Sequence, residues 1–151
     1  MTAPLVPELD VTDLEASLAF YIGVLGFSIR YRRPEERFAY LEREGAELML
    51  EEAAGPGRRF RTAPLERPYG RGMNLQIACS DVTFLYDAVV TARHAVVIPL
   101  ETAWYRAGHV ERGNRQFVVA DADGYLLRLF QDLGERERVG RGSECAAVIR
   151  R

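Results

Sequence analysis

An internal repeat is the feature of this sequence that most limits the folds open to it. The segment Thr12-Asp13-Leu14 returns 68 residues later as Ser80-Asp81-Val82. Apolar residues on either side of the two segments keep the same offset: Leu9 with Ile77, Val11 with Cys79, Leu18 with Tyr86, Tyr21 with Val89, and Ile22 with Val90. The chain therefore encodes two copies of one supersecondary unit.

Each copy of the repeat predicts a strand, a helix and three further strands. In the first copy an apolar run at 5–11 leads into a helix expected over 13–25, where apolar residues recur at spacings of three and four. Thr12 and Glu15 have the spacing of a capping box at the start of this helix. In the second copy the apolar run 73–79 leads into a helix expected to end near His94. The strands predicted after the two helices cover residues 27–31, 37–43 and 46–51, and then 96–100, 116–120 and 125–131, with 102–107 as one more candidate.

Two turns set the register of the final strands. Glu44-Gly45 and Asp123-Gly124 each precede the last strand of a copy, as hairpin turns do. They are 79 residues apart, so the second copy carries 11 extra residues, which we place in 99–114. With this shift, alternate leucines at 48, 50, 127 and 129 are expected to face the helices. The residues expected on the opposite face, where a ligand can bind, are Glu47, Met49, Glu51, Leu126, Arg128 and Phe130.

We expect one α+β domain over residues 1–132, because 151 residues with 48% hydrophobic content suffice for a core. The domain contains module 1 (4–52), an arginine-rich linker or loop (53–72) and module 2 (73–132), and a polar C-terminal tail (133–151) follows it. The linker is rich in glycine, proline and arginine, which predicts either a solvated connection or an arginine-bearing lid.

Composition excludes several classes of function. All 20 positively charged residues are arginine, so mechanisms that need a lysine amine are ruled out. The net charge of -2 argues against nucleic-acid binding, and no apolar run reaches the roughly 18 residues of a membrane span. Cys79 and Cys145 form neither a disulfide framework nor a zinc pattern. Because the N-terminus also lacks signal-peptide features, the sequence favours a cytoplasmic protein whose partner is a small molecule.

The order of these elements resembles the vicinal oxygen chelate superfamily, which comprises glyoxalase, bleomycin-resistance and dioxygenase relatives. The segments that carry the likeness are Val6 to Leu14, Ser17 to Tyr21, Leu25-Gly26-Phe27, Asn114 to Phe117 and Asp121 to Leu129. The resemblance covers residues 4–132 and implies two paired βαβββ modules whose sheets enclose a cleft. It is closest to the bleomycin-resistance branch, which implies a homodimer and a role in antibiotic resistance through an aromatic-lined groove between subunits.

The resemblance also implies four positions where metal-using relatives place their ligands, and here these positions hold Glu8, Met49, Gln76 and Arg128. Hard divalent ions prefer several oxygen or imidazole donors, which this set does not provide. A dication about 4 Å from Arg128 would be repelled by roughly 8 kcal/mol at an effective dielectric of about 20. We therefore expect no metal ion or other cofactor, and we hypothesise that Arg128 pairs with Glu8 across the cleft.

The resulting prediction is a metal-independent binding protein that sequesters an antibiotic or another aromatic or polar ligand without catalysis. The residues predicted to bind the ligand are Glu8, Phe38, Tyr40, Met49, Gln76, Trp104, Tyr105, Arg128 and Phe130. The arginines of the linker would repel a cationic drug if that loop covered the cleft. One alternative is a metal-dependent lyase, isomerase or dioxygenase in which Glu8, Gln76 and either Glu47 or Glu51 hold the ion. A second alternative is a dimeric accessory domain without a ligand.

Overall fold

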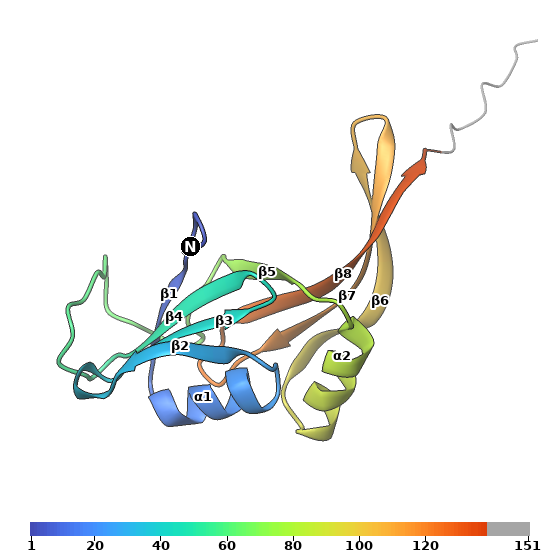
Figure 1. Cartoon of the computed structure of the whole chain (residues 1–151). Coiled ribbons are helices and arrows are strands. Elements are labelled where there is room, and N and C mark those ends of the chain that lie inside the picture. Colours follow the sequence, from blue (N-terminus) through green and yellow to red (C-terminus); the bar gives the residue numbers. More distant parts are fainter. Residues whose placement is uncertain (139–151) are drawn as a thin grey trace, which may run out of the picture.

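Both halves of the repeat fold into a four-stranded mixed sheet that carries one helix (Figure 1). The computed structural model describes residues 1–138; residues 139–151, which include Cys145 and most of the predicted polar tail, lie outside the described residues. Module 1 consists of β1 (Glu8–Val11), α1 (Leu14–Gly23), β2 (Ser28–Arg33), the 3-10 helix η1 (Pro34–Glu36), β3 (Phe38–Arg43) and β4 (Ala46–Glu52). Module 2 consists of β5 (Asn74–Ala78), α2 (Val82–Thr91), β6 (Val96–Ala107), β7 (Val110–Ala120) and β8 (Leu126–Glu137).

The two sheets have the same topology. The strand order is β1-β4-β3-β2 in module 1 and β5-β8-β7-β6 in module 2. In each module the first strand pairs in parallel with the last strand, and the other pairs are antiparallel. The predicted fold class, α+β with two paired βαβββ modules, is therefore confirmed.

Alternation along the final strands separates a buried face from an open face in each sheet. Leu48, Leu50, Leu127 and Leu129 are at most 2% exposed and belong to one hydrophobic core that spans both modules. The helices α1 and α2 lie on the same side of the two sheets (Figure 1), where they pack into this core. The predicted orientation of the leucines is confirmed, and the opposite face of each sheet is left without a covering helix.

Both helices are capped by an aspartate, and α1 is capped one residue later than the sequence predicts. Asp13 accepts a hydrogen bond from the backbone N–H of Ala16 at 2.9 Å, and Asp81 caps α2 in the same way. Thr12, expected to cap α1, instead donates its hydroxyl to Asp123 at 2.6 Å. The capping-box prediction is wrong because a carboxylate satisfies the free N–H groups and also complements the positive end of the helix dipole. No helix within residues 1–138 is long and apolar enough to cross a membrane.

Module 2 carries an arm, formed by residues 102–115 of the β6–β7 hairpin and residues 131–137 of β8, that extends beyond the body (Figure 1). The extra residues of the second copy lie in this arm, as predicted. Three strand predictions need correction: the candidates 96–100 and 102–107 form one strand with irregular register, the strand predicted at 116–120 begins at Val110, and residues 133–137 of the predicted tail continue β8. Ion pairs between oppositely charged side chains of β7 and β8 explain that continuation, which a single-strand pattern does not reveal.

A buried carboxylate organises the connection between β7 and β8. Asp123-Gly124, predicted as a two-residue turn, lies inside a longer connection, where the Oδ1 atom of Asp121 accepts three backbone N–H groups at 2.9–3.0 Å. The Oδ2 atom of Asp121 accepts the hydroxyl of Tyr21 in α1 at 2.9 Å. Burial, followed by the charge of Asp121, raises the pKa of Tyr21 well above its ordinary value. Asp121 therefore links a loop of module 2 to the helix of module 1.

Replacement of Asp121 with alanine is expected to lower the free energy of unfolding by about 3 kcal/mol or more, because it leaves a buried hydroxyl and three backbone N–H groups without an acceptor. Urea denaturation followed by circular dichroism measures this change. Tyr21→Phe is the matched control, since it removes one hydrogen bond and should cost only about 1 kcal/mol. Equal stability of the two variants would contradict the role assigned to Asp121.

Candidate functional site

The two sheet faces without helices are the surfaces from which a ligand can reach the strands. We name them the first open face (module 1) and the second open face (module 2). Strand pairing sets which residues share them, since Glu8 lies opposite Met49 and Gln76 lies opposite Arg128. The four positions that correspond to metal ligands in relatives are thus divided between two sheets.

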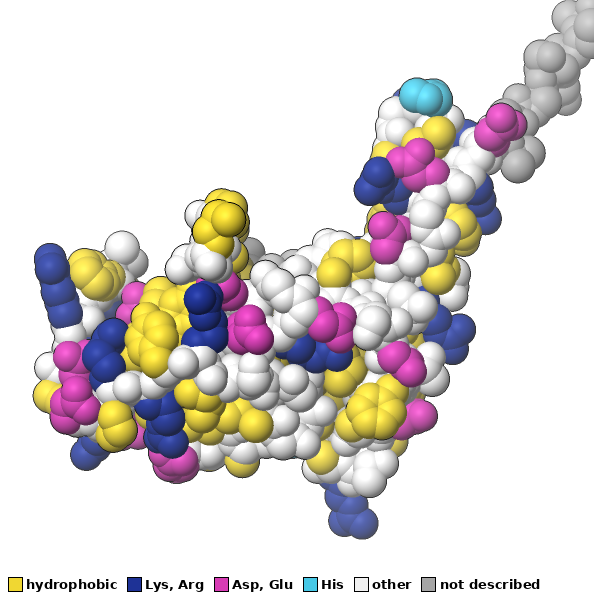
Figure 2. Space-filling model, in the orientation of Figure 1, with side chains coloured by type: hydrophobic (Ala, Val, Ile, Leu, Met, Phe, Trp, Pro, Cys, Tyr) yellow, Lys and Arg dark blue, Asp and Glu magenta, His cyan; other side chains and the backbone are white. Residues whose placement is uncertain are grey.

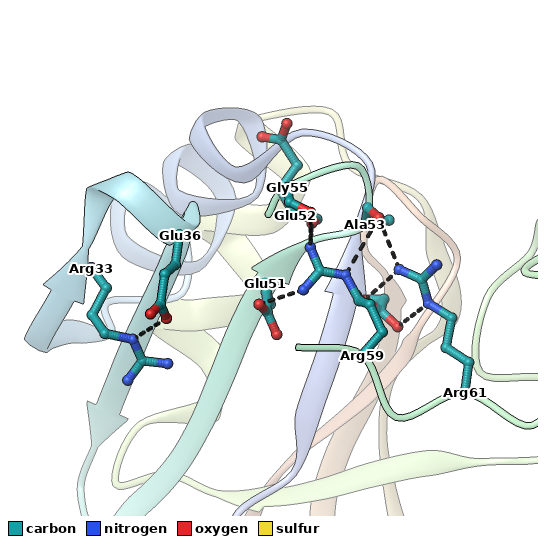
Figure 3. Close-up of polar contacts among 9 residues, drawn as sticks. Arg33, Glu36, Glu51, Glu52, Ala53, Gly55, Arg59 and Arg61 are labelled. Carbon is teal, nitrogen blue, oxygen red and sulfur yellow. Dashed lines mark hydrogen bonds and ion pairs between the residues drawn. The ribbon is translucent and has the colours of Figure 1, made fainter. Parts of the chain in front are cut away.

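Residues 53–61, which we call the strap, cover the first open face with arginine side chains (Figure 3). The guanidinium of Arg59 points toward the sheet and forms an ion pair with the buried carboxylate of Glu51. It also donates hydrogen bonds to the carbonyl oxygens of Glu52 and Gly55 at 2.6 and 2.7 Å. Arg59 therefore neutralises the most deeply buried acid of this face and ties the strap to the end of β4.

Two further features hold the strap against the sheet. Arg61 donates to both carboxylate oxygens of Asp10 at 2.9 Å, a bidentate geometry that strengthens the pair. Gly57 lies so close to Glu51 that a Cβ atom at this position would be 1.7 Å from its Oε1 atom. Arg59, Arg61 and Gly57 thus hold residues 53–61 of the predicted linker against the sheet.

Glu8 lies among the carboxyl groups of module 1. Burial, followed by a hydrogen bond with the Glu51 carboxyl, raises the pKa of Glu8. Arg128, its hypothesised partner, contacts Gln116 and Tyr105 in module 2 instead. Within residues 1–138 no ion pair joins Glu8 to Arg128, so the hypothesis of a direct pair is wrong for the single chain.

The first open face also carries aromatic side chains, but most of their surface is covered. The ring of Tyr31 stacks on Phe38 and Tyr40 with centroid distances of 6.0 and 5.0 Å. Arg33 and Arg30 lie over the rings of Phe38 and Tyr40, and Figure 2 shows hydrophobic side chains flanked by arginines on this side of the molecule. Phe38 and Tyr40 are buried, whereas Tyr31 is 47% exposed. The sequence analysis did not propose Tyr31 as a site residue. A signal for it was present, because Tyr31 ends the predicted strand 27–31 and the next predicted strand contains Phe38 and Tyr40.

The second open face contains a groove of about 420 Å³. It brings together four of the residues predicted to bind a ligand, namely Gln76, Tyr105, Arg128 and Phe130. Asn114 and Asp132 also line the groove, and sequence reasoning did not propose either of them. Asn114 could not be assigned to this face from the sequence, because the predicted strand 116–120 did not reach it, whereas β7 begins at Val110.

A buried amide holds Arg128 in this groove. The Oε1 atom of Gln116, a residue that is 3% exposed, accepts a hydrogen bond from Nε of Arg128 at 2.9 Å. The Nε2 atom of Gln116 donates to Glu101 at 3.0 Å and to the hydroxyl of Tyr105 at 2.5 Å, which fixes the end of the amide that faces the arginine. The guanidinium carbon lies 5.0 Å from the centre of the Tyr105 ring. Arg128 is thus restrained through Nε and through the face of the guanidinium group.

Trp104, predicted to border the same cleft, lies on the opposite face of the arm. Its ring packs so closely over Gly113 that a Cβ atom there would be 2.7 Å away. The guanidinium carbon of Arg136 lies 4.0 Å from the ring centre on this face. Because side chains alternate along β6, Tyr105 points toward the groove and Trp104 points away from it. The groove of this chain therefore does not include Trp104.

The donors on the two open faces do not fit a metal ion. Two of the four positions implied by the family likeness hold the thioether of Met49 and the guanidinium of Arg128, which do not suit a hard divalent ion. Of the additional ligands considered, Glu51 pairs with Arg59 and Glu47 accepts a hydrogen bond from the N-terminal segment. Across residues 1–138 there is no group of three or more His, Cys, Asp or Glu side chains that is arranged to hold a metal ion.

Cys79 follows β5 and is a buried thiol. Burial raises its pKa to about 11, and its Sγ atom donates to the carbonyl oxygen of Phe130 at 3.4 Å. Nucleophilic cysteines act as thiolates. A thiol that stays protonated at neutral pH is therefore a structural residue and not a candidate nucleophile.

Comparison with known proteins identifies the family. The sequence model of the Glyoxalase/Bleomycin resistance protein/Dioxygenase superfamily matches residues 6–129. The chain belongs to this superfamily, as the likeness in its sequence indicated. No curated protein matches the sequence.

Several solved structures share the fold over nearly their whole length. TioX from Micromonospora sp. ML1 is 24% identical with a TM-score of 0.65, over 85% of this chain and 98% of that one. The virulence protein STM3117 from Salmonella typhimurium is 18% identical with a TM-score of 0.63, over 83% and 93% of the two chains. A protein of unknown function from Agrobacterium tumefaciens is 25% identical with a TM-score of 0.61, over 88% and 94%. These likenesses establish the shared architecture.

The strap should loosen when Arg59 is replaced with alanine, because the buried carboxylate of Glu51 then loses its partner. We expect backbone amide exchange in residues 53–61 to speed up by about tenfold, which corresponds to a loss of about 1.4 kcal/mol. Hydrogen exchange followed by mass spectrometry measures this rate. Arg58→Ala is the matched control, because exposed Arg58 only lies over the ring of Phe60, and it should leave the rate unchanged. Equal exchange in the two variants would show that Arg59 does not hold the strap.

Proposed function

We propose that the protein binds small, flat aromatic molecules in the groove of the second open face and holds them without catalysis. The observation that supports this proposal is the combination of side chains around one groove of about 420 Å³. Tyr105 and Phe130 offer aromatic surfaces, whereas Gln76 and Arg128 offer an amide and a guanidinium group. Flat rings stack on aromatic side chains, and a few polar groups then fix the orientation of the ligand.

The polar groups of the groove are suited to binding rather than to proton transfer. A guanidinium group has N–H donors and no acceptor, so Arg128 offers a ligand hydrogen-bond donors only. The amides of Gln76 and Asn114 do not titrate. The Oδ1 atom of Asp132 accepts the backbone N–H of Gly134 at 2.8 Å. The guanidinium of Arg128 and the amides of Gln76 and Asn114 can supply hydrogen bonds to a ligand, and this is the basis for proposing sequestration rather than turnover.

Membership of the superfamily supports a ligand of the antibiotic type, because the family includes bleomycin resistance proteins. The strap arginines cover the first open face, where Glu51 and Asp10 neutralise two of them. Repulsion of a cationic drug therefore comes chiefly from Arg128 in the groove itself. A neutral or anionic aromatic compound is accordingly the proposed ligand.

We also propose that the protein is a homodimer in which a second copy covers the groove. β5 ends at Ala78, opposite Phe130. From Gln131 onward one edge of β8 has no strand beside it within the described chain. Unpaired strand edges readily pair with another chain, and this edge belongs to the arm that extends past the body (Figure 1). Pairing of two arms is the proposed contact.

Light scattering of the purified protein should give twice the mass of one chain. Leu133→Arg, which places a charge on a 40% exposed apolar side chain of the arm, should weaken the dimer by about tenfold or more. Val97→Arg is the matched control, because Val97 is also exposed but lies on β6 outside the arm; it should stay dimeric. A monomeric wild-type protein would refute this part of the proposal.

Naphthalene-2-carboxamide, a neutral two-ring probe, should bind saturably in isothermal titration calorimetry. Phe130→Ala should weaken its binding by about twofold to tenfold, the range expected for one aromatic contact. Tyr31→Ala serves as the control, because it removes an exposed aromatic ring from the first open face, and the Kd should not change. Absence of saturable binding of both this probe and its carboxylate analogue, 2-naphthoate, to the wild-type protein would contradict the proposed function.

A further inference from the structure

We infer that the second open face recognises a carboxylate group on its aromatic ligand and that Arg128 is the residue that binds this group. The inference rests on the proposed binding function and adds the chemical class of the ligand, an aromatic carboxylate. Its basis is the way in which Arg128 is held and the charges that surround it.

Arg128 is held so that one edge of its guanidinium group stays free. Its Nε atom donates to Gln116 at 2.9 Å, and no hydrogen bond or ion pair within residues 1–138 engages its two terminal amino groups. Those two groups form a fork whose parallel N–H bonds match the two oxygens of a carboxylate. Because Gln116 is buried and is itself bound to Glu101 and Tyr105, the fork is oriented before a ligand arrives.

Comparison of the two copies of the module shows that the charge of the second open face is inverted. Strand pairing matches equivalent positions, and these are Glu8 and Gln76, Asp10 and Ala78, Glu51 and Phe130, and Met49 and Arg128. Three carboxylates of module 1 thus become neutral side chains in module 2, and one neutral side chain becomes a cation. The acids that neutralise Arg59 and Arg61 on the first open face have no counterparts beside Arg128.

Two other charged side chains line the groove, Arg112 and Asp132. Arg112 forms an ion pair with Glu135 at 2.6 Å. Asp132 accepts the backbone N–H of Gly134 through Oδ1, and no ion pair within residues 1–138 joins it to Arg128. Arg128 is therefore the cation that remains available for an anionic ligand. Because Tyr105 and Phe130 border the same groove, a ring attached to the carboxylate has an aromatic surface beside it.

The inference is tested with two probes of the same shape, 2-naphthoate and naphthalene-2-carboxamide. Wild-type protein should bind the carboxylate about tenfold more tightly than the amide, on the order expected for a charged hydrogen-bonded pair. Added sodium chloride should reduce this preference. Failure of both probes to bind would sink the proposed function itself, whereas equal binding of the two would overturn only the inference.

Substitutions test whether Arg128 is the residue that causes the preference for 2-naphthoate over the carboxamide. Arg128→Gln should abolish the preference for 2-naphthoate and leave binding of the carboxamide within about twofold. Arg128→Lys, which keeps the charge but not the planar fork, should retain a preference of about threefold. Arg115→Gln is the matched control, because Arg115 is an exposed arginine of β7 that points away from the face of Gln116, and it should keep the full preference. A preference that persists in Arg128→Gln, or that is lost in Arg115→Gln, would overturn the assignment to Arg128.

Discussion

The buried carboxylate of Asp121 is the contact on which the arrangement of the two modules depends. It joins the connection between β7 and β8 to Tyr21 in α1. A second contact nearby, from the hydroxyl of Tyr125 to the carbonyl oxygen of Asp10 at 3.0 Å, links the same two modules. Because these polar contacts surround one shared hydrophobic core, both helices lie on one side of the sheets, and both open faces are left for other uses.

Much of this architecture could be predicted from the sequence, because it follows from local periodicity. The offset between the two copies and the alternation of Leu48, Leu50, Leu127 and Leu129 depend only on spacing, and a period of two assigns each leucine to a face. The capping residues and the end of β8 depend instead on contacts with residues that are distant in the sequence. The sequence predicts Thr12 as a cap, but its hydroxyl donates to the carboxylate of Asp123, a residue far away in the sequence. Residues 133–137 look like a tail until Arg112 and Glu111 of β7 lie beside them.

The candidate site was harder to predict, because it also depends on contacts between residues that lie far apart in the sequence. Gln76, Arg128 and Phe130 meet because two neighbouring strands place them on one face, and strand alternation indicates this. Glu8 and Met49 lie on the other sheet, and no local pattern states how two modules face each other. Tyr105 and Trp104 are neighbours in sequence, yet they point to opposite faces of one strand. Because side chains alternate between the two faces of a strand, this difference follows from the sequence as soon as β6 is known to include both residues.

The two open faces show how one module can serve opposite electrostatic purposes after duplication. Every basic residue of the Lys and Arg type in this chain is an arginine, so the side-chain ion pairs within residues 1–138 are made by planar forks of N–H donors. On the first open face the chain supplies both partners, because Arg59 from the strap meets Glu51. On the second open face the position of Glu51 is held by Phe130, and the cation comes from the strand itself at Arg128. The ion pair between Arg59 and Glu51 is neutral within the chain itself, whereas the terminal amino groups of Arg128 have no acidic partner within residues 1–138. One face of the fold is thus covered by its own strap, and the other is the face where we propose that an anionic ligand pairs with Arg128.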